Sequence, residues 1–202
     1  MNGAAALAGF VLVGGKSLRM GSDKALLECD DTPLASRVAG QLKQVADEVT
    51  LVGDAALYGH LGFPVVPDHA MGRGPLSGIE AALDSEFARD WNLIVACDMP
   101  LLHAGLFAEL RQKALQASPQ TDCIVPMTSG KLQPLCAVYR RCCGTVVSGA
   151  LQRGTRRVVD AVQMLQAEVW PTEDAQLFQN VNTRAEWLQF LLDWQAAQRN
   201  ER

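Results

Sequence analysis

The sequence has no block of basic residues, and its overall charge is slightly negative. Its 202 residues carry 18 lysine and arginine against 22 aspartate and glutamate side chains, which gives a formal net charge of −4. Proteins that bind nucleic acid by neutralising phosphates are usually basic. The sequence also has no run of lysine and arginine residues that could bind an anionic membrane surface. We therefore expect neither nucleic acid nor a membrane as a partner.

Cysteine spacings typical of metal sites and disulfide frameworks are also missing. The six cysteines include no CxxC pair, and Cys142 and Cys143 are adjacent. Cys97, Cys123 and Cys136 fall in apolar runs, where a free cysteine packs as a small hydrophobic residue. The pattern predicts reduced, structural cysteines.

Long apolar runs are absent as well. The first stretch, MNGAAALAGFVLV, lacks a basic n-region, and its apolar part is too short to cross a membrane. Together with reduced cysteines, this indicates a cytoplasmic protein whose first apolar run is a buried strand.

Short apolar runs alternate with amphipathic stretches along the chain. The runs are rich in β-branched residues without polar alternation, as in strands buried on both faces. They cover residues 8–13, 48–52, 63–66, 92–97 and 122–127. This order predicts an α/β protein, a three-layer α/β/α sandwich with a mainly parallel sheet. Its site should lie at the carboxyl ends of the strands.

Helical periodicity separates these runs. Apolar residues share one helical face after Pro33 and after Pro75, each a favourable first helical residue. A third helix is expected around residues 106–115 and a last one over 183–198, where Thr183 and Glu186 have capping-box spacing. No linker or repeat stands out, so we expect one domain over residues 1–202.

The segment LVGGKSLRMGSDKALL, residues 12–27, follows the first apolar run. Within it, Gly15-Lys16-Ser17 matches the last three residues of a P-loop motif. A P-loop requires a glycine five places before Gly15, and that residue is Phe10. The glycines do not fit the dinucleotide pattern GxGxxG either. Spacing therefore excludes both common phosphate loops.

What remains in this segment still suits a nucleotide. Gly14 and Gly15 lack side chains, so a ligand can approach the main-chain amides. Arg19 and Lys24 add two cations suited to triphosphate oxygens. The alternative is a glycine-rich turn without a ligand.

Two aspartates follow apolar runs at the expected edge of the sheet. Asp98 is suited to Mg²⁺, which prefers one or two carboxylates together with substrate phosphates and water, although it can also cap a turn. Asp68 is a second candidate, with an ordinary loop residue as its alternative. Gly74 and Pro75 open a helix whose N-terminus can face a base or a phosphate.

Five segments in order resemble the MobA-type molybdenum cofactor guanylyltransferases, which belong to a nucleotidyltransferase superfamily with a Rossmann-like fold. They are LVGGKSLRMGSDKALL (12–27), VVPDHAMGRGPLSGI (65–79), IVACDMPLL (94–102), QPLCAVY (133–139) and FQNVNT (178–183). The resemblance implies Mg²⁺-dependent transfer of GMP from GTP to molybdenum-molybdopterin, with release of pyrophosphate. Cofactor-donor and molybdoenzyme-acceptor proteins are the partners it implies.

The same resemblance assigns roles to individual residues. Arg19, Lys24 and Asp98 would be catalytic, with Asp98 as the Mg²⁺ ligand, and Asn180 and Asn182 would bind molybdopterin. The GTP contacts would be Leu12, Val13, Gly14, Gly15, Lys24, Asp68, Gly74, Pro75, Leu76 and Asp98. Nucleotide would then bind in the half formed by about residues 1–103 and the acceptor in the half formed by about 104–202.

Two departures from the family pattern concern base selectivity. Val13 replaces the alanine of the usual LAGG, and its side chain can crowd whatever the loop faces. The family tends to have an asparagine just after the second strand, where this chain has Val52-Gly53-Asp54. Open alternatives are cytidylyl transfer to the same cofactor, transfer to a sugar phosphate or isoprenoid precursor, and a non-catalytic carrier of nucleotide or cofactor.

Overall fold

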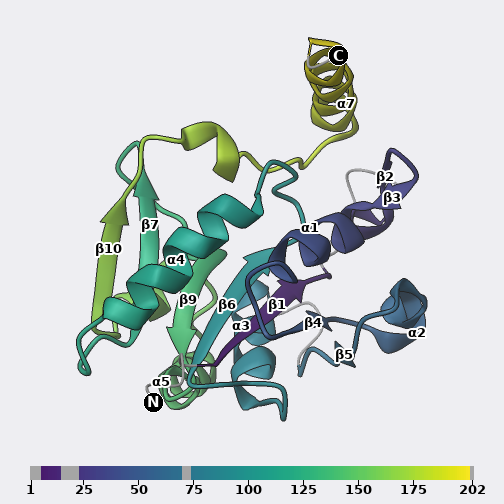
Figure 1. Cartoon of the computed structure of the whole chain (residues 1–202). Helices are drawn as coiled ribbons and strands as arrows, with labels where there is room; N and C mark the ends of the chain where they lie inside the picture. Colours follow the sequence, from purple (N-terminus) through teal and green to yellow (C-terminus); the bar gives the residue numbers. More distant parts are fainter. Residues whose placement is uncertain (1–5, 15–22, 70–73, 201–202) are drawn as a thin grey trace.

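The apolar runs form one sheet in the computed structural model, which describes residues 6–14, 23–69 and 74–200 (Figure 1). The order of the eight-stranded sheet is β10-β7-β9-β6-β1-β4-β5, with β8 paired to β7. Its strands are β1 (Leu7–Leu12), β4 (Glu48–Val52), β5 (Val65–Val66), β6 (Trp91–Ala96), β7 (Cys123–Thr128), β8 (Lys131–Leu132), β9 (Cys136–Arg140) and β10 (Ala167–Pro171). A separate antiparallel hairpin consists of β2 (Glu28–Cys29) and β3 (Thr32–Pro33).

Most neighbouring strands in the sheet are parallel. β1 pairs in parallel with β4 and β6, as do β4 with β5 and β7 with β10. The exceptions are β9, which is antiparallel to both β6 and β7, and the short β8. The predicted α/β class with a mainly parallel sheet is confirmed. The carboxyl ends of β1, β4 and β6 therefore meet at one edge.

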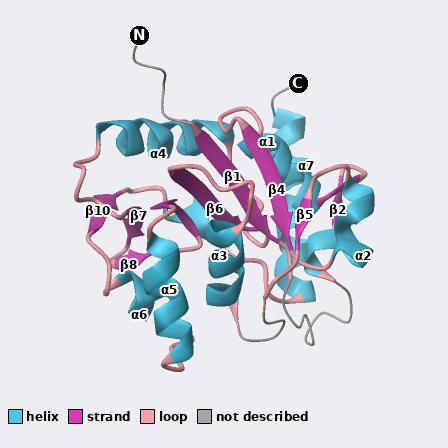
Figure 2. Ribbon diagram, turned by 90° about the horizontal axis from the view of Figure 1, so that it is seen from below, coloured by secondary structure: helices cyan, strands magenta, loops and turns pink. Residues whose placement is uncertain are grey.

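Helices cover both faces of the sheet and make three layers (Figure 2). On one face lie α1 (Leu34–Leu42) and α4 (Ala104–Gln116), and on the other α3 (Pro75–Asp84), α5 (Cys143–Gln152) and α6 (Val158–Val162). The short α2 (Ala55–Tyr58) follows β4, and α7 (Arg184–Asn200) ends the described chain. Among the described residues, none of the helices has the length and apolarity needed to cross a membrane.

Strand β1 separates two apolar cores. Leu7 and Val11 pack in the core that includes α1 and α4, whereas Phe10 and Leu12 pack in the core that includes α3 and α5. Side chains alternate between the two faces of a strand. Because both faces are covered, every residue of β1 is buried, and this explains its continuous apolar run.

The two helix-initiating prolines occupy different positions. Pro75 is the first residue of α3, as predicted, and Gly74 before it has a φ of 91°, a left-handed value that favours glycine. Pro33 is instead the N-cap residue of α1, so the expectation that it is the first helical residue is wrong. The reason is that Pro33 still pairs with Glu28 in the β2–β3 hairpin, and the helix begins one residue later.

The six cysteines are all free thiols, and only Cys142 among them is exposed. Ligand atoms of Asp122, Cys142 and Cys143 lie within 4.8 Å of one another, at the amino end of β7. The Cys143 thiol donates a hydrogen bond to the Asp122 carbonyl, and a carboxylate oxygen of Asp122 accepts one from the Gln166 amide. Burial also raises the pKa of Cys143. Cys143 is thus part of the packing, as predicted for a structural cysteine, whereas Cys142 is exposed.

Candidate active site

A cavity of about 360 Å³ opens at the carboxyl ends of the central strands. Its walls consist of the strand ends and of the segments next to them, which is where ligands bind in α/β sheets. The lining residues are Leu12, Gly14, Asp23, Lys24, Ala25, Val52, Asp68, Gly74, Pro75, Gly78, Ala96, Cys97, Asp98 and Leu135. Seven of the predicted GTP contacts are among them.

The end of β1 contributes alternate residues to the cavity. Leu12 and Gly14 line it, whereas the Val13 side chain is fully buried in the core of α1 and α4. Val13 therefore does not crowd the cavity, because strand alternation directs it to the opposite face. Of Val13, only the main-chain atoms could make the predicted contact with GTP.

The end of β4 has no room for a side chain after Val52. Val52 lines the cavity, and Gly53 follows it. A Cβ atom on Gly53 would lie 2.2 Å from the Val13 carbonyl oxygen and 2.9 Å from the Tyr58 ring. No side chain fits there without moving the main chain that leads into the glycine-rich loop.

This crowding predicts the effect of Gly53→Ala. We expect the variant to lose roughly 1–3 kcal/mol of unfolding free energy, as overpacked sites do. Gly40→Ala is the matched control, since a Cβ on Gly40 in α1 meets nothing within 4 Å and alanine favours helices. Chemical denaturation of both variants measures the difference. Equal stabilities would show that Gly53 is not sterically required.

The start of α3 forms another wall of the cavity. Gly74, Pro75 and Gly78 line the cavity, and a Cβ on Gly78 would lie 3.2 Å from the Leu12 side chain. Leu76, a predicted GTP contact, is fully buried in the core instead. A helix N-terminus carries a partial positive charge, which suits an anionic or polar ligand group.

Lys24 lies at the centre of the polar groups in the site. Its Nζ donates a hydrogen bond to the Asn182 side-chain oxygen at 2.7 Å and lies 3.8 Å from a carboxylate oxygen of Asp98. The side chains of Lys24 and Asp98 are 18% and 23% exposed. The structure thus brings together residues that were assigned separately to nucleotide, metal and acceptor.

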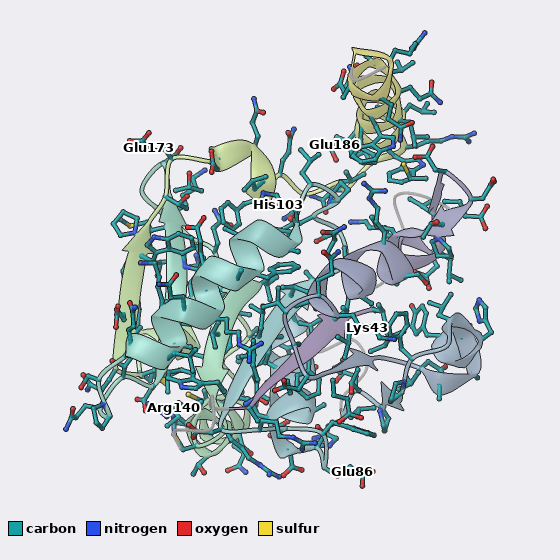
Figure 3. All side chains as sticks on the ribbon, in the orientation of Figure 1. Lys43, Glu86, His103, Arg140, Glu173 and Glu186 are labelled. Atoms are coloured by element: carbon teal, nitrogen blue, oxygen red, sulfur yellow. The ribbon has the colours of Figure 1, made fainter. Side chains whose placement is uncertain are left out.

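The segment that carries Asn182 is fixed by main-chain bonds. The Val181 amide donates to the Asp98 carbonyl at 2.8 Å, which ties this segment to the end of β6. Glu186, in the first turn of α7, accepts from the Asn182 and Thr183 amides, and its own amide donates to the Thr183 hydroxyl (Figure 3). The predicted capping box is confirmed. Since Thr183 and Glu186 cap the helix, the Asn182 side chain is available to Lys24.

Asp98 has the properties of a metal ligand. Its Oδ1 atom is buried without a hydrogen-bond partner among the described residues. Burial raises the pKa of Asp98, and the nearby Lys24 charge opposes this by lowering it. An unpartnered carboxylate oxygen beside the cavity suits Mg²⁺, because this ion is usually held by one or two carboxylates together with substrate oxygens and water. The residues present therefore fit the predicted cation.

The ion pair predicts a shift that can be measured without metal. Lys24→Ala should raise the pKa of Asp98 further, because the opposing charge is lost. In both proteins the folded state holds this proton more tightly than the unfolded state, so the contribution of Asp98 to the unfolding free energy falls as pH rises through its raised pKa. NMR titration of the Asp98 carboxyl measures the shift. An unchanged or lower pKa in Lys24→Ala would contradict the ion pair.

The remaining predicted residues lie in different places. Gly15 and Arg19 are outside the described residues. Asp68 lines the cavity after β5, and Asn180 is exposed on the segment before α7. Sequence reasoning missed Leu135, although it lies in the QPLCAVY segment that carries part of the resemblance.

Residues 9–168 match the model of the MobA-like NTP transferase domain. The chain belongs to this family. The matched residues include the glycine-rich segment, the start of α3 and Asp98, so the family's domain coincides with the walls of the cavity.

Relatives within the MobA-like family span nearly the same length. A probable molybdenum cofactor guanylyltransferase of Pelotomaculum thermopropionicum is 39% identical over 184 residues, 87% of each chain. A protein of the same description from Carboxydothermus hydrogenoformans is 33% identical, over 90% of this chain and 93% of its own. The crystal structure of molybdopterin-guanine dinucleotide biosynthesis protein A from Archaeoglobus fulgidus has a TM-score of 0.76 at 22% identity, covering 90% and 95%. This last likeness establishes a shared fold.

Proposed function

We propose that this protein transfers GMP from GTP to molybdenum-molybdopterin, which forms the guanine dinucleotide cofactor and releases pyrophosphate. The observation that carries the proposal is the contact of Lys24 with both Asp98 and Asn182 at the cavity. These contacts support a role for Lys24 between the nucleotide, the metal and the acceptor. Relatives described as probable molybdenum cofactor guanylyltransferases over about 90% of the chain support it.

The reaction joins two phosphates. An oxygen of the acceptor's terminal phosphate forms a bond to the α-phosphorus of GTP, and the bond between the α-phosphorus and the bridging oxygen to the β-phosphate breaks. The nucleophile is already an anion at neutral pH, so no general base is needed. Pyrophosphate leaves with the electron pair of the broken bond.

The chain's residues serve to bring two anions together. Asp98 would hold Mg²⁺, which supplies Lewis acidity and a template for the phosphates when it is bound. Lys24, which lies 3.8 Å from Asp98, would neutralise charge on the α-phosphate and the leaving pyrophosphate. The amides at the start of α3 and at Gly14 can orient the nucleotide. Asn182 positions the lysine and would contact the acceptor.

The proposed reaction also implies partner proteins and a cellular compartment. A donor protein would supply molybdenum-loaded molybdopterin, molybdoenzymes would receive the product, and the reaction would occur in the cytoplasm. The proposal names GTP as the nucleotide because the two adjacent glycines, Gly14 and Gly15, and the GPLSG segment (74–78) favour GTP over CTP.

Nucleotide selectivity tests the proposal. Pyrophosphate release is measured with Mg²⁺ and molybdenum-loaded molybdopterin, with either GTP or CTP. We expect release with GTP to exceed release with CTP by at least ~10-fold, a modest base discrimination by a polar site. Preference for CTP would identify a cytidylyltransferase, and no release with either nucleotide would identify a carrier.

A further inference from the structure

Tyr58 makes a hydrogen bond that links α2 to the segment before Lys24. It is the last residue of α2 and is 3% exposed. Its hydroxyl donates to the Oδ2 atom of Asp23 at 2.6 Å, although the two residues are 35 positions apart. Buried tyrosine hydroxyls usually find a partner. Here the partner directly precedes Lys24.

Asp23 in turn shapes the turn that carries Lys24. Its second carboxylate oxygen accepts from the Ala25 amide at 3.0 Å, and its carbonyl accepts from the Leu26 amide. Asp23 is thus the N-cap of the 3-10 helix η1 (Lys24–Leu26). A single turn of this kind has little stability by itself. A bond from another element therefore helps to hold it in one position, together with the packing of Ala25 in the core.

Tyr58 is well placed to supply that bond. Asp54 caps α2 by accepting from the Ala56 amide at 2.8 Å, and its carbonyl accepts from the Tyr58 amide. The Tyr58 ring lies over Gly53, where no Cβ would fit. Burial raises the pKa of Tyr58, and the hydrogen bond to Asp23 adds a smaller increase, so the hydroxyl remains a donor.

We propose that Tyr58 is a positioning residue, which acts through Asp23 to hold the η1 turn so that Lys24 faces Asp98 and Asn182. The chain would use α2, an element outside the nucleotide-contacting segments, to fix its central cation. The kinetic part of this inference rests on the proposed function, and the positional part does not.

Tyr58→Phe removes only the hydroxyl. We expect kcat for guanylyl transfer to fall about 10-fold with the KM for GTP changed less than about 2-fold, because a displaced Lys24 loses charge stabilisation in the transition state. In a Lys24→Ala background the same substitution should lower kcat no further, since the residue it positions is gone. Asp23→Asn, which keeps one acceptor oxygen, should give a smaller loss than Tyr58→Phe.

A direct readout is the reactivity of Lys24 towards an amine-acylating reagent, followed by mass spectrometry with exposed Lys43 as the internal reference. Tyr58→Phe should raise the Lys24 rate several-fold, about the change expected when a fixed and mostly buried amine is freed. Tyr139→Phe is the matched control. Tyr139 is the only other tyrosine, it is buried, and its hydroxyl donates to the Pro134 carbonyl at 2.6 Å. It should leave Lys24 reactivity unchanged.

Two results would overturn the inference. One is wild-type Lys24 reactivity and kcat in a folded Tyr58→Phe protein. The other is a Tyr58→Phe loss that persists undiminished in Lys24→Ala. If the wild-type protein transfers nothing from GTP, the proposed function fails, whereas a raised Lys24 reactivity in Tyr58→Phe would still support the positioning role.

Discussion

Asp98→Ala is expected to lower kcat for guanylyl transfer at least ~100-fold, since removing one preorganised charge-stabilising group typically costs that much. Asp98 is the carboxylate at the end of β6 whose Oδ1 atom is buried and unpartnered among the described residues. Without it Lys24 has no ion-pair partner among the described residues, and two phosphates would have to approach without the cation that Asp98 is proposed to hold. Steady-state pyrophosphate release at saturating GTP measures the effect.

A second variant separates the loss of the metal ligand from a loss of folding. Asp98→Asn keeps the shape of the side chain and should also be impaired. Excess Mg²⁺ should restore little of its rate. Asp84→Ala removes a carboxylate that is 76% exposed at the end of α3 and should behave as wild type. A rate for Asp98→Ala within about 3-fold of wild type, less than 1 kcal/mol in barrier, would contradict the metal-ligand role.

Lys24→Ala is expected to cause a loss of similar size, at least ~100-fold in kcat. Lys24 Nζ lies 2.7 Å from Asn182 and 3.8 Å from Asp98, so the variant removes the one described cation that contacts both. Lys24→Arg should recover part of the rate. It keeps the charge, but its planar group replaces a compact ammonium and cannot occupy the same geometry. Single-turnover measurement of labelled product reports the chemical step.

Lys43→Ala provides the control for Lys24. Lys43 is exposed at the C-terminal end of α1, near the segment where the Asp47 carboxylate accepts from the Leu7 amide at the start of β1 (Figure 3). That end of the sheet is opposite the cavity. Equal losses in Lys24→Ala and Lys43→Ala would show a general charge effect and contradict a specific role for Lys24.

The fold was predictable where the sequence pattern depends on burial alone. Apolar runs located β1, β4, β6 and β7, and Pro75 and the Thr183–Glu186 box located two helix starts. The run in β9 looks like its neighbours, because burial on both faces produces it whatever the strand direction. Its antiparallel place between β6 and β7 therefore could not be predicted. β10 is an edge strand with exposed residues and gave no apolar run.

The site was predictable where a residue's chemistry is local. Asp98, Lys24 and Gly74 stand next to strand or helix ends, and the structure places all three at the cavity. Tyr58 could not be predicted, since its role depends on a contact 35 residues away. The contact between Lys24 and Asn182 joins positions 158 residues apart, and only the folded chain reveals it.

Transfer of label from GTP carrying a radioactive α-phosphate to molybdenum-loaded molybdopterin tests the central claim most directly. The wild-type protein with Mg²⁺ should produce one labelled dinucleotide for each pyrophosphate released, and Lys24→Ala and Asp98→Ala should produce almost none. Label that appears only as free GMP, or that reaches the acceptor equally well in both variants, would contradict the account.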